Sequence, residues 1–299
     1  MEKIDVALQA DEPLRAGLLR VADHLVTHAV ERIRNPTSDR VEDLHFVRVT
    51  IKRLRAILRL IRPAIKKGAF KRENVRLRTA ARRLSIARDA DVARQTLAAL
   101  LFAKQSEKDS AAVALAGFRK NGAPEANLSQ TMKVTALDLN ETKRNLHRLR
   151  ISRHEWKAIE PGIRKVYRQC RKRMKRALRR GDDEAYHKWR IRIKSLYYEL
   201  QMLQLVWPTR LTKMVAGLNK LQDQIGADHD LVVLQRSLDR NPDRFGGPES
   251  VKRVLRSVIN KRRKLRRTMD PLGKAILDQT SCRFVRELGQ HWNIWRKIA

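Results

Sequence analysis

The chain has 299 residues, enough for two domains of ordinary size or one duplicated domain, and 42% of them are hydrophobic, which argues against disorder. Its 67 Lys and Arg outnumber its 32 Asp and Glu, so the formal net charge is +35, and an anionic partner would relieve the resulting self-repulsion. Two cysteines cannot build a disulfide scaffold, and neither a secretory signal nor a stretch long enough to span a bilayer is visible, so we expect a cytoplasmic protein with no membrane partner.

Sparse proline and glycine, with many strong helix formers between them, predict helices along most of the chain. We expect them at residues 13–34, 40–62, 70–102, 106–118, 131–150, 162–180, 183–206, 209–238, 249–269 and 272–297. Short alternating stretches around Val47 and Ile191 also fit strands. However, the apolar residues from Leu44 to Ile61 keep helical spacing over five turns, too long for a strand without a turn. The predicted fold class is all-α.

The sequence repeats itself at an offset of about 140 residues. The apolar set that begins at Leu44 returns at Tyr186 with the same spacing, and Val92 has an equivalent in Val233. We therefore expect two helical repeats, residues 1–150 and 151–299, whose equivalent residues surround a shared cleft. Asn, Gly, Pro and Ser between residues 119 and 129 predict a mobile linker between them.

Basic side chains form ridges beside the apolar stripes of three predicted helices. An ordinary solvated helix would place acids at these spacings, and none occurs among the ridge residues. Repulsion along one such helix costs roughly 1–3 kcal/mol, which an anion of dense charge would reverse. A solvated charge run is the alternative, disfavoured because the ridge recurs in both halves. The ridges comprise His45, Arg48, Lys52, Arg55 and Arg59, then Arg164, Arg168, Arg171 and Lys175, and finally His187, Arg190 and Lys194.

The ridges point to a phosphate-rich polymer. Guanidinium groups match phosphate oxygens in pairs, but proteins that bind single-stranded nucleic acid also need aromatic platforms. Only 5% of this chain is aromatic, and no zinc-finger, RNA-recognition or Gly-rich phosphate motif is present. Inorganic polyphosphate therefore fits better than nucleic acid, which remains the alternative and the expected weaker competitor.

Several segments together resemble the CHAD family (conserved histidine α-helical domain). The segments from His45 and from His187 resemble its two signature helices, while residues 87–92 and 221–230 and the basic helix around Tyr167 match its other motifs. The resemblance runs from about residue 10 to 297. It implies two four-helix bundles, related by a pseudo-two-fold axis, around a basic channel that binds polyphosphate. It places Arg53 and all the ridge residues in that channel. In the second half, the positions equivalent to Arg53, Arg55 and Arg59 hold Ser195, Tyr197 and Gln201. The loss of these bases predicts that the second half binds polyphosphate more weakly.

Metal and catalytic sites are weaker interpretations of the remaining motifs. His24 and His28 have the spacing of a metal pair, but two ligands do not make a site. His229 and Asp230 resemble a metal-phosphohydrolase dipeptide, although the equivalent of His229 is Arg88, which repels cations. We expect Asp89 and Asp230 to make structural contacts, and Cys170 to be buried. Four carboxylates could suggest a Mg²⁺ site, namely Asp89, Asp91, Asp228 and Asp230.

The sequence thus predicts a non-enzymatic polyphosphate-binding protein without cofactor or metal. We expect it in the cytoplasm and on polyphosphate granules, with granule-associated proteins as further partners. A polyphosphate hydrolase or kinase is a third alternative, disfavoured because no acidic metal cluster is apparent. Reversing the charge of Arg48 and Arg190 is expected to cost more affinity than reversing Arg262 and Arg266, which the sequence places on a distal helix.

Overall fold

The structure is a computed structural model that describes residues 5–84, 89–100, 102, 104–118 and 125–298. Within these ranges it contains α-helices and three short 3₁₀ helices but no strand, so the predicted all-α class is confirmed. The helices are α1 Leu14–Arg34, α2 Arg40–Leu60, α3 Lys67–Arg83, α4 Asp89–Ala98, α5 Gln105–Phe118, α6 Glu125–Arg148, α7 Glu155–Arg180, α8 Asp183–Met202, α9 Pro208–Arg240, α10 Pro248–Ile276 and α11 Ser281–Trp295, with η1 Arg62–Ala64, η2 Gln204–Val206 and η3 Pro242–Phe245.

Two predicted helix starts are wrong because each was placed next to a proline that lies inside a longer helix. Pro161 lies inside α7 and Pro271 lies inside α10, where starts were expected. A proline removes one backbone hydrogen bond, but burial of the residues on both sides holds each helix together: Ile159 and Ile163 are fully buried around Pro161. The predicted helix 70–102 is two helices, α3 and α4. Of the predicted linker, residues 125–129 belong to α6 and residues 119–124 lie outside the described part of the chain.

The core is built from the two predicted apolar stripes. All residues of the α2 stripe and of the α8 stripe are buried, including Val47, Ile51, Trp189 and Ile193, which are 0% exposed. These stripes meet in a large hydrophobic cluster that also contains residues of α1, α3, α6, α7 and α11. A second, smaller hydrophobic cluster packs α4 and α5 against the C-terminal part of α9 and the N-terminal part of α10.

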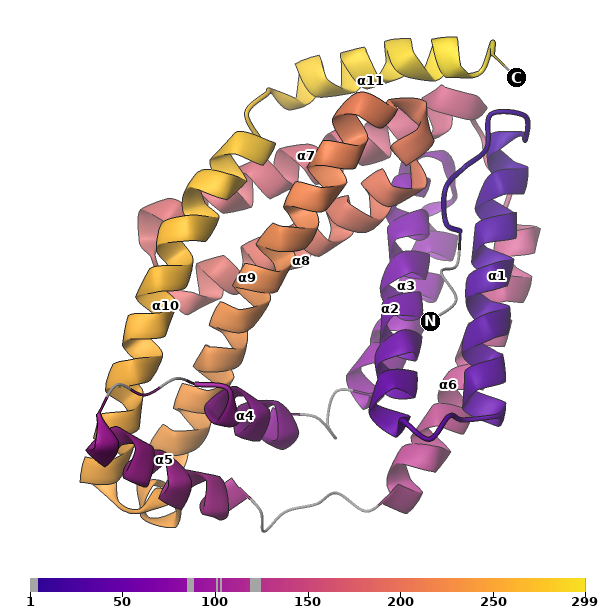
Figure 1. The fold of residues 1–299 in the computed structure, drawn as a ribbon. Helices are drawn as coiled ribbons and strands as arrows, with labels where there is room; N and C mark the ends of the chain where they lie inside the picture. The colour runs from indigo at the N-terminus through magenta and orange to yellow at the C-terminus, as the bar shows by residue number, and fades with distance from the viewer. Residues whose placement is uncertain (1–4, 85–88, 101, 103, 119–124, 299) are drawn as a thin grey trace.

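The helices form two groups that meet where α2 lies against α8 (Figure 1). The helices α1, α2, α3 and α6 pack together on one side, and α7, α8, α9 and α10 pack together on the other. Although α4 and α5 precede residue 150, they pack on α9 and α10 (Figure 1). The division into repeats at residue 150 and the pseudo-two-fold axis stay predictions. The consequence for function is that ridges from both halves of the sequence lie next to each other.

One glycine allows the close contact between α7 and the end of α2. A Cβ atom at Gly162 would lie 2.0 Å from the Leu60 carbonyl oxygen and 3.0 Å from the Arg59 carbonyl oxygen. Any larger residue would force the two helices apart. Gly162 therefore fixes how α7 approaches α2.

Candidate functional site

A cavity of about 650 Å³ lies between α2, α8 and α9, with Val92 of α4 at its wall. Two of the predicted ridges reach it. Three pairs that the sequence repeat makes equivalent line the same cavity: Arg48 with Arg190, Lys52 with Lys194, and Val92 with Val233. His45 and Arg53 also line it. Equivalent residues of the two halves thus meet around one cleft, as expected.

Helix capping and stripe burial together turn the ridges toward the cavity. The Asp39 carboxylate accepts hydrogen bonds from the backbone N–H groups of Val41 and Glu42, both at 2.9 Å, and Asp182 caps α8 through Ala185 N–H at 2.7 Å. From these fixed starts, burial of each apolar stripe leaves the neighbouring ridge on the cavity side. Arg48 is further oriented by donating from Nη1 to the Leu84 carbonyl oxygen at 3.1 Å, at the end of α3.

Burial and the neighbouring positive charges together lower the pKa of Lys194 and His229 in the cavity wall. Burial, aided by Arg190 and Lys52, lowers the pKa of Lys194 to about 7, although Asp230 opposes this shift. Burial and then Arg190 lower the pKa of His229 to about 4. Both shifts mean that a positive charge is costly here without an added anion.

Carboxylates also line the cavity, which the ridges alone did not predict. Glu42 precedes the α2 ridge, and Asp223 and Asp230 come from α9. The predicted absence of acids holds within the ridge and not for the cavity as a whole. Five Arg and Lys side chains outnumber these three carboxylates, so the described lining still carries net positive charge.

Two further predicted residues contact aromatic rings at the cavity. The imidazole centroid of His187 lies 5.0 Å from that of His229, so His187 borders the cavity wall without lining it. Burial, followed by Arg190, lowers its pKa. The guanidinium carbon of Arg53 lies 6.0 Å from the ring centroid of Tyr198, in the range of a cation–π contact.

Arg55 and Arg59 continue the α2 ridge beyond the cavity. Arg55 donates from Nε to the Asn74 side-chain oxygen at 3.2 Å, and burial together with Arg78 and Arg192 lowers its pKa. Burial and the neighbouring Arg55 lower the pKa of Arg59 to about 10. These two residues form a second basic cluster with Arg192 rather than part of the cavity lining.

The four predicted residues of α7 are not in the cavity, contrary to what the family resemblance implied. Arg171 donates from Nε to the Leu277 carbonyl oxygen at 3.0 Å, and Arg164 forms an ion pair with Glu160. Arg168 and Lys175 are exposed. The physical reason is that the apolar stripe of α7 packs into the core, so the ridge on the far side of that helix faces solvent.

The cavity wall on α9 was not predicted as part of the site. Its lining residues recur every three or four positions, which is the signal of one helix face. The wall mixes amide, carboxylate and imidazole groups, so it did not stand out as a basic motif. The lining residues of α9 are Asn219, Gln222, Asp223, Gly226, Ala227, His229, Asp230 and Val233.

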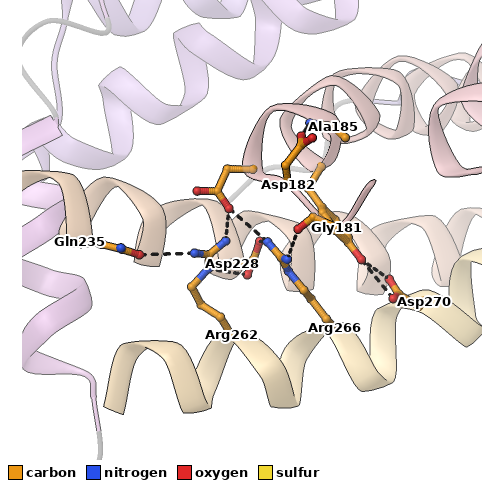
Figure 2. Close-up of polar contacts among 10 residues, drawn as sticks. Gly181, Asp182, Ala185, Asp228, Gln235, Arg262, Arg266 and Asp270 are labelled. Atoms are coloured by element: carbon orange, nitrogen blue, oxygen red, sulfur yellow. Dashed lines mark hydrogen bonds and ion pairs between the residues drawn. The ribbon is translucent and has the colours of Figure 1, made fainter. Parts of the chain in front are cut away.

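Arg262 and Arg266 are structural residues and not distal free charges (Figure 2). Asp228 is 2% exposed and accepts hydrogen bonds from Arg262 Nε at 3.0 Å and Arg266 Nη2 at 3.3 Å. Arg262 also pairs with Asp183, and Arg266 donates to the Gly181 carbonyl oxygen at 2.5 Å. They hold α10 against α8 and α9, so they cannot serve as the neutral comparison that the sequence suggested.

The other expectations concern buried or metal-binding side chains. Cys170 is fully buried, as expected, and burial raises its thiol pKa to about 12. The side chains of Asp89 and Asp91 lie outside the described residues, as does Arg88. Within the described part of the chain, no group of three or more His, Cys, Asp and Glu side chains is arranged to hold a metal ion.

Comparison with known proteins decides the family. The CHAD domain model matches residues 16–239. The chain belongs to the CHAD domain family. The crystal structure of the CHAD domain from the plant Ricinus communis superimposes with a TM-score of 0.61, at 19% identity, over 93% of this chain and 96% of that chain. A search of curated proteins found no match.

None of the described helices combines the length and the apolar character needed to cross a bilayer.

Proposed function

We propose that this CHAD domain protein binds inorganic polyphosphate in the cavity between α2, α8 and α9, without catalysing a reaction. The observation that carries the proposal is that equivalent basic residues of both halves, Arg48 with Arg190 and Lys52 with Lys194, line one cavity. The lowered pKa of Lys194 supports it, because an anion placed there would offset both the burial and the repulsion. We further propose that the protein acts in the cytoplasm, on polyphosphate granules, together with granule-associated proteins.

The shape of the site favours a thin polyanion over nucleic acid. A cavity of about 650 Å³ suits a single chain of phosphates and is too small for a duplex. Stacking of bases needs open aromatic faces. Tyr198 is only 7% exposed and Arg53 lies over its ring, so this ring offers no open face for a base.

Charge reversal in the cavity tests the proposal. We expect Arg48→Glu combined with Arg190→Glu to weaken polyphosphate binding strongly, measured by titration calorimetry. The matched control is Arg72→Glu with Arg148→Glu, two exposed residues on α3 and α6 that change the net charge equally. Thermal melts would verify that both variants fold. Equal loss of affinity in the two variants would mean that net charge, and not the cavity, holds the polymer.

Competition separates polyphosphate from nucleic acid as the preferred ligand. We expect neither single-stranded nor duplex nucleic acid to displace labelled polyphosphate when both polymers are present at equal charge concentration. Displacement would favour the nucleic-acid alternative. Incubating the protein with polyphosphate and Mg²⁺ tests the enzymatic alternative, and we expect no release of inorganic phosphate above the level without protein.

A further inference from the structure

The helix α10 carries a row of exposed bases on its outer side. Arg256, Arg263, Arg267 and Lys274 are all exposed, and their separations of seven, four and seven residues put them on one side of the helix. Val254, Val258 and Met269 are buried on the other side. By the rise of an α-helix, the row is about 27 Å long.

The helix α7 carries a second outer row. Arg168, Lys172, Lys175 and Arg179 are exposed and follow one another at separations of four, three and four residues. They lie opposite the buried stripe that contains Ile163 and Cys170. Arg168 and Lys175 are two of the residues that the structure leaves outside the cavity.

Two hydrogen bonds place the rows side by side. Arg171 Nε donates to the Leu277 carbonyl oxygen at 3.0 Å, and Arg266 Nη1 donates to the Gly181 carbonyl oxygen at 2.5 Å. Moving forward along α7 from the first contact to the second means moving backward along α10. The two helices therefore run antiparallel over this stretch, at the edge of the molecule away from α2 (Figure 1). The row of α7 therefore lies beside Arg267 and Lys274, while Arg256 and Arg263 extend beyond the end of α7.

The charge of these rows is not neutralised by nearby acids. Among the described residues, no carboxylate oxygen lies within 4 Å of a basic nitrogen of either row, whereas the inward-facing Arg262 and Arg266 each form ion pairs with Asp183 and Asp228. Asp270 lies on the same side of α10, but it accepts a hydrogen bond from the Tyr186 hydroxyl at 3.0 Å. The paired arginines fix α10 and so hold Arg263 and Arg267 outward.

We infer that the α7–α10 surface is a second binding surface for linear polyphosphate, separate from the cavity. This inference rests on the proposed function. Adjacent packed helices lie about 8–10 Å apart, a spacing at which long Arg and Lys side chains from both rows reach one thin chain of phosphates. The rows contain no aromatic residue on which a base could stack, which favours polyphosphate over single-stranded nucleic acid. One protein molecule would then hold two separate polymer segments.

Titration calorimetry with a short polyphosphate, which cannot span both surfaces at once, tests the inference. We expect two binding sites per molecule in the natural protein. Arg263→Glu with Arg267→Glu is expected to weaken the outer site by roughly tenfold or more and leave the cavity site unchanged. Arg48→Glu with Arg190→Glu is expected to do the reverse. Both outer substitutions are at exposed positions, and thermal melts would verify folding.

The outcomes distinguish this inference from the proposed function. If the outer variant keeps both sites, the outer surface does not bind polyphosphate and the proposed function stands. The same conclusion follows if only one site exists and the cavity variant abolishes it. If neither variant loses binding, both are wrong. If nucleic acid displaces polyphosphate from the outer site at equal charge concentration, the surface serves a different polymer and the inference is overturned.

Discussion

At the scale of single residues, Lys194 is the group whose charge depends most directly on the ligand. Its pKa of about 7 leaves it largely neutral at pH 8, because burial and the neighbouring Arg190 disfavour the ammonium form. A bound polyanion would favour that form and raise the pKa. Binding should therefore be linked to proton uptake above pH 7.

This linkage predicts that affinity for polyphosphate falls as the pH rises from 7 to 9. The affinity falls because Lys194 must take up a proton when polyphosphate binds, and the proton concentration decreases as the pH rises. Calorimetry at pH 8 in two buffers of different ionisation enthalpy would measure the uptake directly. Lys194→Arg stays charged at these pH values and should reduce the uptake. An unchanged uptake in that variant would assign the proton to another group.

Glu199 is the most unusual buried acid among the described residues. It is 0% exposed and neither carboxylate oxygen has a hydrogen-bond partner. Burial raises its pKa well above 4.5, even though Arg59 and Arg192 oppose the shift. The folded state therefore binds this proton more tightly than the unfolded state, and stability is lost as the pH rises above 4.5.

We predict that Glu199→Gln has the stability of the natural protein at pH 5 and is more stable at pH 8, because the amide cannot ionise. Denaturant unfolding of both proteins across this range would measure the difference. The amide matches the neutral carboxylic acid in shape, so packing should be preserved. A loss of about 3–5 kcal/mol of unfolding free energy at pH 7 would instead show that Glu199 is ionised and compensates the charges of Arg59 and Arg192.

At the scale of helices, α10 alternates between residues that hold the fold and residues that face solvent. Arg262 reaches the buried Asp228, while Arg263 is exposed one position later. Arg262→Met should cost about 2–4 kcal/mol of unfolding free energy, because it leaves a buried carboxylate with only Arg266. Arg263→Met is the matched control and should change stability by less than about 0.5 kcal/mol. Similar losses in both would refute the anchoring role of Arg262.

The helices also show what sequence reasoning could reach. The apolar stripes of α2 and α8 were predictable because their spacing admits one buried face, and Val47 and Trp189 are indeed fully buried. The interior position of Pro161 was not predictable, since it depends on core packing on both sides of that proline. The ridge of α7 was visible, but the direction it faces is set by how α7 packs, which periodicity does not encode.

At the scale of the whole molecule, the cavity exists because two distant segments meet. Arg48 and Arg190 are separated by 142 positions, and the α2–α8 contact brings both to one cavity. We expected a shared cleft by analogy with other duplicated domains, since the sequence repeat alone does not place the two halves. The repeat did not predict the wall supplied by α9, because Asp223 and Asp230 belong to no basic motif. The cavity, the Arg55 and Arg59 cluster and the outer rows are thus three separate groups of basic residues in a chain whose net charge is +35.

This distribution gives a prediction about salt. Each phosphate that the protein neutralises contributes about 0.7 to the slope of log K against log salt for a single-stranded polyanion. Five Arg and Lys side chains line the cavity, so the slope for the cavity site should approach about −3.5 if each contacts a phosphate. The measurement is made in the Arg263→Glu, Arg267→Glu background, which isolates the cavity. Adding the single neutral substitution Arg48→Gln should reduce the slope by about 0.7, since one contact is lost. A slope near zero in the isolated cavity would contradict electrostatic binding, and a steep slope unaffected by the cavity substitution would show that the charge acts diffusely.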